Sequence, residues 1–212
     1  MDLSAAEVRV LGSLMEKDAT TPDNYPLTVN SLLLACNQST NRHPVVNYGE
    51  AEVSATLTSL RERGLTRIVY SQSNRAPKHR HVANDVLRLE PEEQALLCVL
   101  LLRGAQTLGE LKARTERMHL FSDLGAVETA LDRLAVRDEP LVVHLPRRPG
   151  QKDARYAHLL SGPFIESAEE ELSLSTPARL DRIGSLSDRV DELERRVAEL
   201  TSVIEALRSL LD

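Results

Sequence analysis

The stretch that decides the fold is residues 49–83, GEAEVSATLTSLRERGLTRIVYSQSNRAPKHRHVA. Its first part predicts a helix that begins at Gly49 and ends near Gly64, because apolar side chains recur at spacings of four and three. These apolar residues are Val53, Leu57 and Leu60. Residues 65–70 are rich in β-forming side chains, and a turn separates them from the basic segment 78–82. The stretch therefore predicts a helix followed by a two-stranded hairpin.

Two shorter amphipathic helices are expected before this stretch. Ser4 and Glu7 have the spacing of a capping box at the start of the first helix, and Thr28 is the expected N-cap of the second. Three helices followed by a hairpin outline a winged helix-turn-helix, whose last helix and hairpin contact DNA. The polar connection 37–44 is longer than the turn of about three or four residues in a simple helix-turn-helix, which favours a specialised protein.

The same plan recurs in residues 86–162. Gly104 is expected to end the first helix of this second copy, and Ser122 to cap the third. The pattern Val-x-x-x-Leu-x-x-Leu of the third helix is the same in both copies, and a second hairpin is expected after it. We therefore predict an α+β chain, mainly helical with small β hairpins, with winged-helix domains at residues 1–85 and 86–162.

The remainder of the chain is expected to contain an acidic linker at 163–179 and a coiled-coil dimerisation helix at 180–212. Apolar residues occupy every a and d position of the heptads, with β-branched residues at most a positions and Leu at each d position, which favours a parallel dimer. These positions are Ile183, Leu186, Val190, Leu193, Val197, Leu200, Ile204, Leu207 and Leu211. The alternative is a helix that folds back on its own domain.

Charge and composition restrict the functional classes. The formal net charge is −6, and residues 166–212 contain twelve acidic and six basic residues, so the rest of the chain is neutral and must bind nucleic acid through local patches. Cys36 and Cys98 lie in apolar runs and are expected to be core residues. With no secretory signal pattern and no apolar run longer than 95–102, we expect a cytoplasmic protein outside the membrane.

DNA binding is the leading functional hypothesis, as a possible transcriptional regulator that contacts phosphates through its basic hairpins. The candidate nucleic-acid-binding residues are Asn41, Arg42, Arg61, Arg63, Arg75, Lys78, Arg80, Arg147, Arg148, Lys152 and Arg155. His79 and His81 are expected to add to the first basic hairpin. Two observations oppose base readout. The third helices expose acidic residues such as Glu50 and Glu128, and the Asn-rich connection could instead satisfy its own backbone.

Other classes of function stay open at this point. A tandem winged-helix scaffold for protein–protein interaction fits the neutral body and the acidic helix faces, by analogy of fold alone. Catalysis is not expected, because nucleophile-elbow, metalloprotease and phosphate-loop patterns are absent from the sequence. His79 and His81 could share a face of a strand as zinc ligands, but a third ligand is not near in sequence, so no metal or cofactor is expected.

Several motifs resemble those of the YceH family of bacterial proteins. The resemblance covers most of the body of the chain. The matching runs are TTPDNYPL at 20–27, ACNQ at 35–38, NRxPV at 41–45, LRGAQT at 102–107, GEL at 109–111, FSD at 121–123 and RYxHL at 155–159. The resemblance implies a tandem winged-helix fold without an established activity. Members of that family typically have Lys where this chain has Ser39, an acidic residue where it has His43, and a different continuation after Lys78.

Overall fold

The computed structural model describes residues 1–70, 76–147 and 152–164. These residues belong to a compact unit, Met1–Phe164, and the chain from Ile165 onward falls in a second unit. The predicted acidic linker from residue 165 and the predicted coiled-coil helix lie outside the described residues. The predicted boundary between residues 85 and 86 lies inside the first unit, and the buried core residues on its two sides form one cluster.

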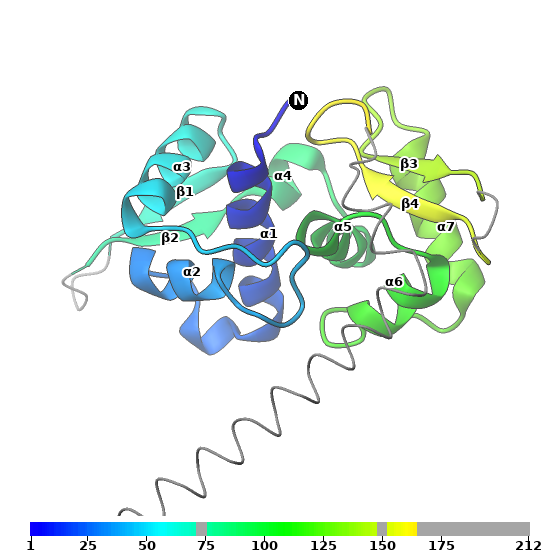
Figure 1. Cartoon of the computed structure of the whole chain (residues 1–212), viewed down its shortest axis with the longest axis horizontal. Helices are drawn as coiled ribbons and strands as arrows, with labels where there is room; N and C mark the ends of the chain where they lie inside the picture. Colours follow the sequence, from blue (N-terminus) through cyan, green and yellow to red (C-terminus); the bar gives the residue numbers. More distant parts are fainter. Residues whose placement is uncertain (71–75, 148–151, 165–212) are drawn as a thin grey trace, which may run out of the picture. The chain divides into compact units, whose positions relative to one another are not determined.

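The first unit contains two successive sets of three helices and one hairpin (Figure 1). The first module, residues 5–81, consists of α1 (Ala5–Thr20), the short 3-10 helix η1 (Pro22–Asn24), α2 (Val29–Cys36), α3 (Glu50–Glu62), β1 (Thr66–Val69) and β2 (Lys78–His81). A short helix, α4 (Ala83–Leu87), precedes the second module. That module, residues 91–158, consists of α5 (Pro91–Arg103), α6 (Leu108–Thr115), α7 (Leu124–Ala135), β3 (Val142–Leu145) and β4 (Arg155–His158). The expected mixed α and β character, with small antiparallel sheets, is confirmed.

Several helix boundaries follow from capping residues that the sequence predicts. The Ser4 hydroxyl accepts a hydrogen bond from the backbone N–H of Glu7, whose carboxylate accepts one from the backbone N–H of Ser4. The Thr28 hydroxyl caps α2 by accepting a hydrogen bond from the backbone N–H of Ser31, without a reciprocal bond. Gly64 follows α3 with φ of 75°, a left-handed conformation that favours glycine. Local side-chain chemistry therefore decides where these helices begin and end.

The prediction that Ser122 caps α7 is wrong. Asp123 is the N-cap residue, because its carboxylate accepts a hydrogen bond from the backbone N–H of Ala126 at 2.8 Å. The Ser122 hydroxyl lies 3.1 Å from the other carboxylate oxygen of Asp123 and supports the cap from outside. Both residue types are good N-caps, so sequence alone left the position uncertain by one residue.

A residue before the second helix of each module pairs with the last strand of its hairpin. Leu27 exchanges two backbone hydrogen bonds with His79, of 3.1 and 2.7 Å, and Gln106 exchanges two with Tyr156, of 2.9 and 2.7 Å. Each hairpin is thereby attached along β2 or β4 to its own helices. The two modules therefore share backbone hydrogen bonding as well as the order of their elements.

A buried carboxylate joins the first and third helices of the first module. Glu7 on α1 accepts hydrogen bonds from Ser59 on α3 and from Arg63 just after it, both at 2.8 Å. Burial alone would raise the pKa of Glu7, but its hydrogen bonds with Ser4 and Ser59 and the charge of Arg63 lower it. The ionised carboxylate therefore stabilises the packing of α3 against α1.

The second module has the same contact at equivalent positions. Glu93 on α5 accepts from Arg133 at 3.2 Å and from Arg137 at 2.6 Å. Arg133 stands one residue before the last leucine of the Val-x-x-x-Leu-x-x-Leu pattern, as Ser59 does, and Arg137 stands three residues after it, as Arg63 does. The two modules therefore use one buried carboxylate on the first helix to fix the third.

The modules pack on each other through their first helices, α1 and α5. Gly12 on α1 faces Leu101 and Leu102 on α5 so closely that an added Cβ would lie 3.0 Å from atoms of the Leu102 side chain. The Gly12 carbonyl also accepts a hydrogen bond from the thiol of Cys98. At one end of this contact, the backbone N–H of Leu3 donates to the carbonyl of Leu160 at 2.7 Å. The absence of a side chain at Gly12 allows the two helices to approach.

Replacement of Gly12 by Leu should destabilise the unit. The added side chain has no space between α1 and α5, and we expect a loss of about 1–3 kcal/mol in the free energy of unfolding. Urea unfolding followed by circular dichroism measures this loss. The matched control is Gly109→Ala on α6, where an added Cβ has no neighbour within 4 Å. That variant should gain up to about 1 kcal/mol, and an equal loss in both variants would contradict the packing argument.

Replacement of Glu7 by Gln should make the free energy of unfolding less dependent on pH in the acid range. Because the pKa of Glu7 is lowered by folding, its stabilisation is present above the pKa of the unfolded chain and is lost as the pH falls through the folded pKa. We expect Glu7→Gln to cost about 1–2 kcal/mol at neutral pH and much less near pH 3, measured by urea unfolding at each pH. Glu62→Gln, at an exposed position, is the control and should cost almost nothing at either pH.

Candidate nucleic-acid interface

The connection between α2 and α3 holds two of the predicted nucleic-acid-binding residues, and one of them is inaccessible. The Arg42 side chain is 0% exposed and pairs with Glu16 at 2.6 Å. Its guanidinium also donates to the carbonyl of Ala35 and to the side-chain oxygen of Gln38. Burial alone would raise the pKa of Glu16, but the hydrogen bond and charge of Arg42 lower it. The assignment of Arg42 to nucleic acid is corrected, because its binding capacity is used inside the fold.

Asn41 is exposed but participates in the same structural network. It adopts φ of 60°, and its side-chain oxygen accepts a hydrogen bond from Arg103 at the end of α5. The backbone N–H of His43 donates to the carbonyl of Leu102 at 2.8 Å. The Asn37 side-chain amide donates to the carbonyl of Tyr48 and accepts a hydrogen bond from its backbone N–H. These contacts support the alternative in which the polar connection satisfies backbone groups, and they attach it to α5.

A second buried arginine also contacts this connection. Arg9 on α1 is 4% exposed and donates to the carbonyls of Cys36 and Pro44. Burial lowers the pKa of Arg9, and the nearby charge of Arg42 lowers it further. The polar connection is therefore built around two guanidinium groups that face the protein interior.

The first hairpin has one basic face. In the β1–β2 register Arg67 lies directly opposite Arg80, and Val69 lies opposite Lys78. Because side chains alternate along a strand, Arg67, Lys78 and Arg80 share the face turned away from the core. Arg67 and Arg80 are both exposed, and neither pairs with a carboxylate of the described part of the chain. We refer to Arg67, Lys78 and Arg80 together as the basic face.

The two histidines of β2 do not belong to this face, contrary to the sequence-based expectation. His79 and His81 are buried, because alternation turns them toward the helices. The Nε2 atom of His81 lies 3.0 Å from Asp18, and its backbone N–H donates to the Tyr25 hydroxyl. Burial lowers the pKa of His79, and the charge of Arg61 on α3 lowers it further.

Two other arginines predicted to contact nucleic acid have different environments. Arg61 is exposed on α3 and has no carboxylate partner among the described residues. Arg63 pairs with Glu7 and is needed for the contact between α1 and α3, although its side chain is 41% exposed. Arg61 and Arg63 are close in sequence, but the charge of Arg61 is available to a binding partner, whereas the charge of Arg63 is paired with Glu7.

The second hairpin differs from the first. Arg147 and Lys152 are exposed, whereas Arg155 on β4 is only 8% exposed. The positions that match Arg67 and Arg80 are Val143 and Ala157, which lie opposite each other in the β3–β4 register. Arg75 and Arg148 lie outside the described residues. The second hairpin therefore has no counterpart of the arginine pair.

The basic residues of the two hairpins do not form one strip. In Figure 1 the β1–β2 and β3–β4 hairpins lie on opposite sides of α1 and α5. The third helices expose acidic side chains, as expected from the sequence. Exposed carboxylates are Glu50, Glu52 and Glu62 on α3 and Glu128 and Asp132 on α7. Any nucleic-acid contact therefore has to be argued for one hairpin at a time.

Arg67 was not among the predicted nucleic-acid-binding residues, although the structure places it at the centre of the basic face. The signal was present in the alternation of β1, since Arg67 stands between Thr66, which is buried, and the partly buried Ile68. Its pairing with Arg80 depended on the hairpin register, which the sequence did not specify.

Comparisons with known proteins identify the family to which this chain belongs. Residues 3–151 match the family described as "Protein of unknown function, DUF480". A UPF0502 protein from Geobacter sulfurreducens is 49% identical over 98% of this chain and 97% of its own length. The UPF0502 protein YceH from Salmonella paratyphi B is 46% identical over 97% of this chain and 96% of its own length. The chain belongs to this UPF0502 family, which includes YceH, so the resemblance stated above is confirmed.

Membrane insertion has no support from the described helices. Not one of those in residues 1–70, 76–147 and 152–164 combines the length and the hydropathy that a membrane crossing requires.

Arg42→Gln should lower the free energy of unfolding far more than Arg61→Gln, because Arg42 is buried and Arg61 is on the surface. The first variant removes the buried guanidinium and leaves the partly buried carboxylate of Glu16 with Lys17 alone, and we expect a loss of about 1–3 kcal/mol in the free energy of unfolding. The second changes an exposed side chain and should change stability by less than about 0.5 kcal/mol. Urea unfolding of both variants measures the difference, and similar stabilities would contradict a structural role for Arg42.

Proposed function

We propose that this protein binds duplex nucleic acid, with DNA as the expected partner, through the basic face of its first hairpin. The order of elements in each module supports a tandem winged-helix class, in which hairpins contact the DNA backbone. The role is one of binding rather than catalysis. It requires no metal or cofactor.

The observation that carries this proposal is the pair formed by Arg67 and Arg80. Like charges directly opposite each other in an antiparallel sheet are destabilising, so the pair costs folding energy in the free protein. A phosphate placed between the two guanidinium groups would remove that repulsion and form charge-assisted hydrogen bonds. Lys78 extends the positive charge along the same face of the hairpin. The arrangement is suited to phosphates and makes no use of base identity.

A dimer would increase the affinity of this small face. The heptad positions from Ile183 to Leu211 favour a parallel coiled coil, and two copies of the basic face on one duplex would bind with a higher effective concentration. Paired faces are also the usual arrangement in transcriptional regulators of the helix-turn-helix type. We therefore extend the proposal to a dimeric DNA-binding regulator.

A protein–protein scaffold is the second candidate function. The separation of the two hairpins and the acidic surfaces of α3 and α7 favour it, because carboxylates on the third helix repel phosphate where base readout would occur. A scaffold of this kind would bind no DNA at low salt. The two candidates therefore differ in a direct measurement.

The test is the salt dependence of binding to a random-sequence duplex, measured by fluorescence anisotropy with the full-length chain. Replacing Arg67 and Arg80 together by Gln should weaken binding and reduce the slope of log affinity against log salt by about 1, since the phosphate contact shared by the pair is lost. The control replaces Arg147 and Lys152 by Gln, which removes the same charge from the second hairpin. Equal effects of the two double variants would contradict the assignment to the first hairpin, and no binding by the unmodified protein at low salt would favour the scaffold.

A further inference from the structure

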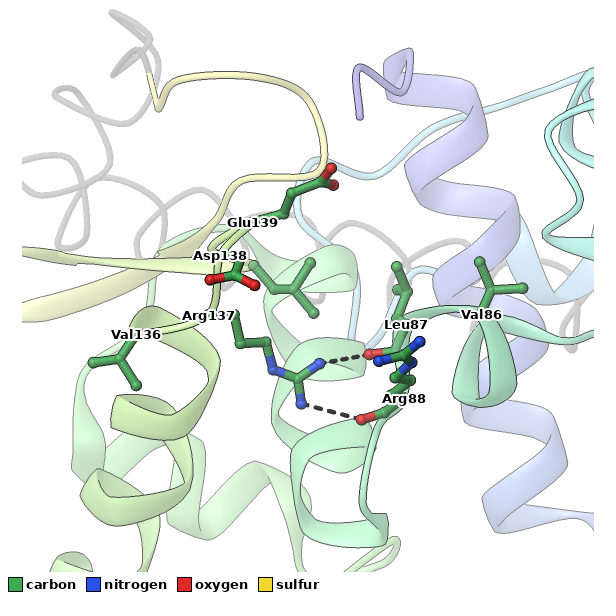
Figure 2. A pocket seen from close by; sticks show the side chains of 8 residues that line it. Val86, Leu87, Arg88, Val136, Arg137, Asp138 and Glu139 are labelled. Carbon is green, nitrogen blue, oxygen red and sulfur yellow. Dashed lines mark hydrogen bonds between the residues drawn. The ribbon is translucent and has the colours of Figure 1, made fainter.

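A groove with a volume of about 660 Å³ lies beside the second module (Figure 2). One wall is the segment 86–88, which leads from α4 toward α5, and the other is the segment 136–139 after α7. Leu141 also lines the groove and is buried at 6% exposure. The volume falls within the range of about 300–1,000 Å³ that small-molecule sites occupy.

Arg137 holds the two walls together. Its guanidinium donates to the carbonyl oxygens of Leu87 and Arg88 on the opposite wall, as Figure 2 shows. The same guanidinium pairs with the buried Glu93 at 2.6 Å. The groove is therefore formed before any ligand enters, and the charge of Arg137 is already neutralised.

The first module has no equivalent groove wall. In both modules a leucine beyond the third helix donates its backbone N–H to a carbonyl oxygen of that helix. Leu65 donates to Leu60 at 2.8 Å, and Leu141 donates to Leu134 at 3.0 Å. Four residues separate the first pair and six separate the second. The second module thus has two additional residues in this turn, and the lengthened turn includes the groove wall at 138–139. Insertions in surface turns are common carriers of binding function.

The two walls have opposite charge and an apolar lining. Arg88 is exposed on one wall, Asp138 and Glu139 are exposed on the other, and none of the three forms an ion pair with another described residue. Val86 and Val136 are 47% and 81% exposed, so apolar surface lines both sides. A complementary ligand has an ammonium group at one end, a carboxylate at the other and apolar groups between them.

We propose that this groove binds a short apolar peptide with free termini, whose ammonium group meets Asp138 and Glu139 and whose carboxylate meets Arg88. The proposal is independent of nucleic-acid binding, since the groove shares no residue with the basic face. A peptide of two or three residues carries both charges and has a size suited to a groove of this volume.

Isothermal titration calorimetry of the full-length chain with three related dipeptides tests the proposal. Leucyl-leucine carries both charges, its N-acetyl form lacks the ammonium group, and its C-terminal amide lacks the carboxylate. We expect leucyl-leucine to bind, and each blocked form to bind at least about tenfold more weakly. Equal binding of a blocked form would overturn the assignment of that terminus, and no binding of leucyl-leucine up to about 10 mM would overturn the proposal.

Three variants locate the binding. Asp138→Asn combined with Glu139→Gln should weaken leucyl-leucine at least about tenfold and leave the N-acetyl form unchanged. Arg88→Gln should weaken leucyl-leucine and leave the amide unchanged. Glu128→Gln, at an exposed position on α7, is the control for charge and should bind as the unmodified protein does. All the substituted positions are exposed, so thermal unfolding should confirm intact folding. Unchanged binding in the double variant would place the peptide elsewhere.

Discussion

The close contact of α1 with α5 at Gly12 is the constraint on which the arrangement of the modules depends. A side chain at this position would separate the two helices, and with them the backbone contacts from Leu3 to Leu160 and from His43 to Leu102. Because these contacts lie at different points of the interface, they restrict rotation of one module against the other. The contact also positions the hairpins on opposite sides of the helix pair, which limits what a single binding partner can reach.

Much of the fold could be predicted from sequence because its determinants are local. Apolar spacing predicted α3 and α7, and caps such as Ser4, Thr28 and Gly64 predicted where helices begin and end. The recurrence of one pattern predicted that the two modules would have the same elements. The packing of one module on the other could not be predicted, because it depends on the size of a single residue, Gly12, relative to a helix far away in sequence.

The candidate site was predicted less well, for a related reason. An arginine has the same appearance in sequence whether it faces solvent or a buried carboxylate. Arg42 pairs with Glu16 on α1 and Arg63 pairs with Glu7, and neither partner lies near its arginine in the chain. Arg67 was missed because its importance depends on the register with Arg80. Strand alternation alone would have separated His79 and His81 from the basic residues beside them.

The recurring contact of Glu7 and Glu93 with the end of the third helix bears on the history of the chain. A carboxylate at the same helical position, bound by residues at two matched positions, is more simply explained by duplication of one ancestral unit than by two separate origins. The duplicates differ on their hairpins, where the exposed Arg67 and Arg80 of one copy correspond to the partly buried Val143 and the buried Ala157 of the other. A shared internal contact that holds the helices in place leaves the hairpins free to diverge. Each module can thus serve as the reference for judging which contacts and surfaces belong to the other alone.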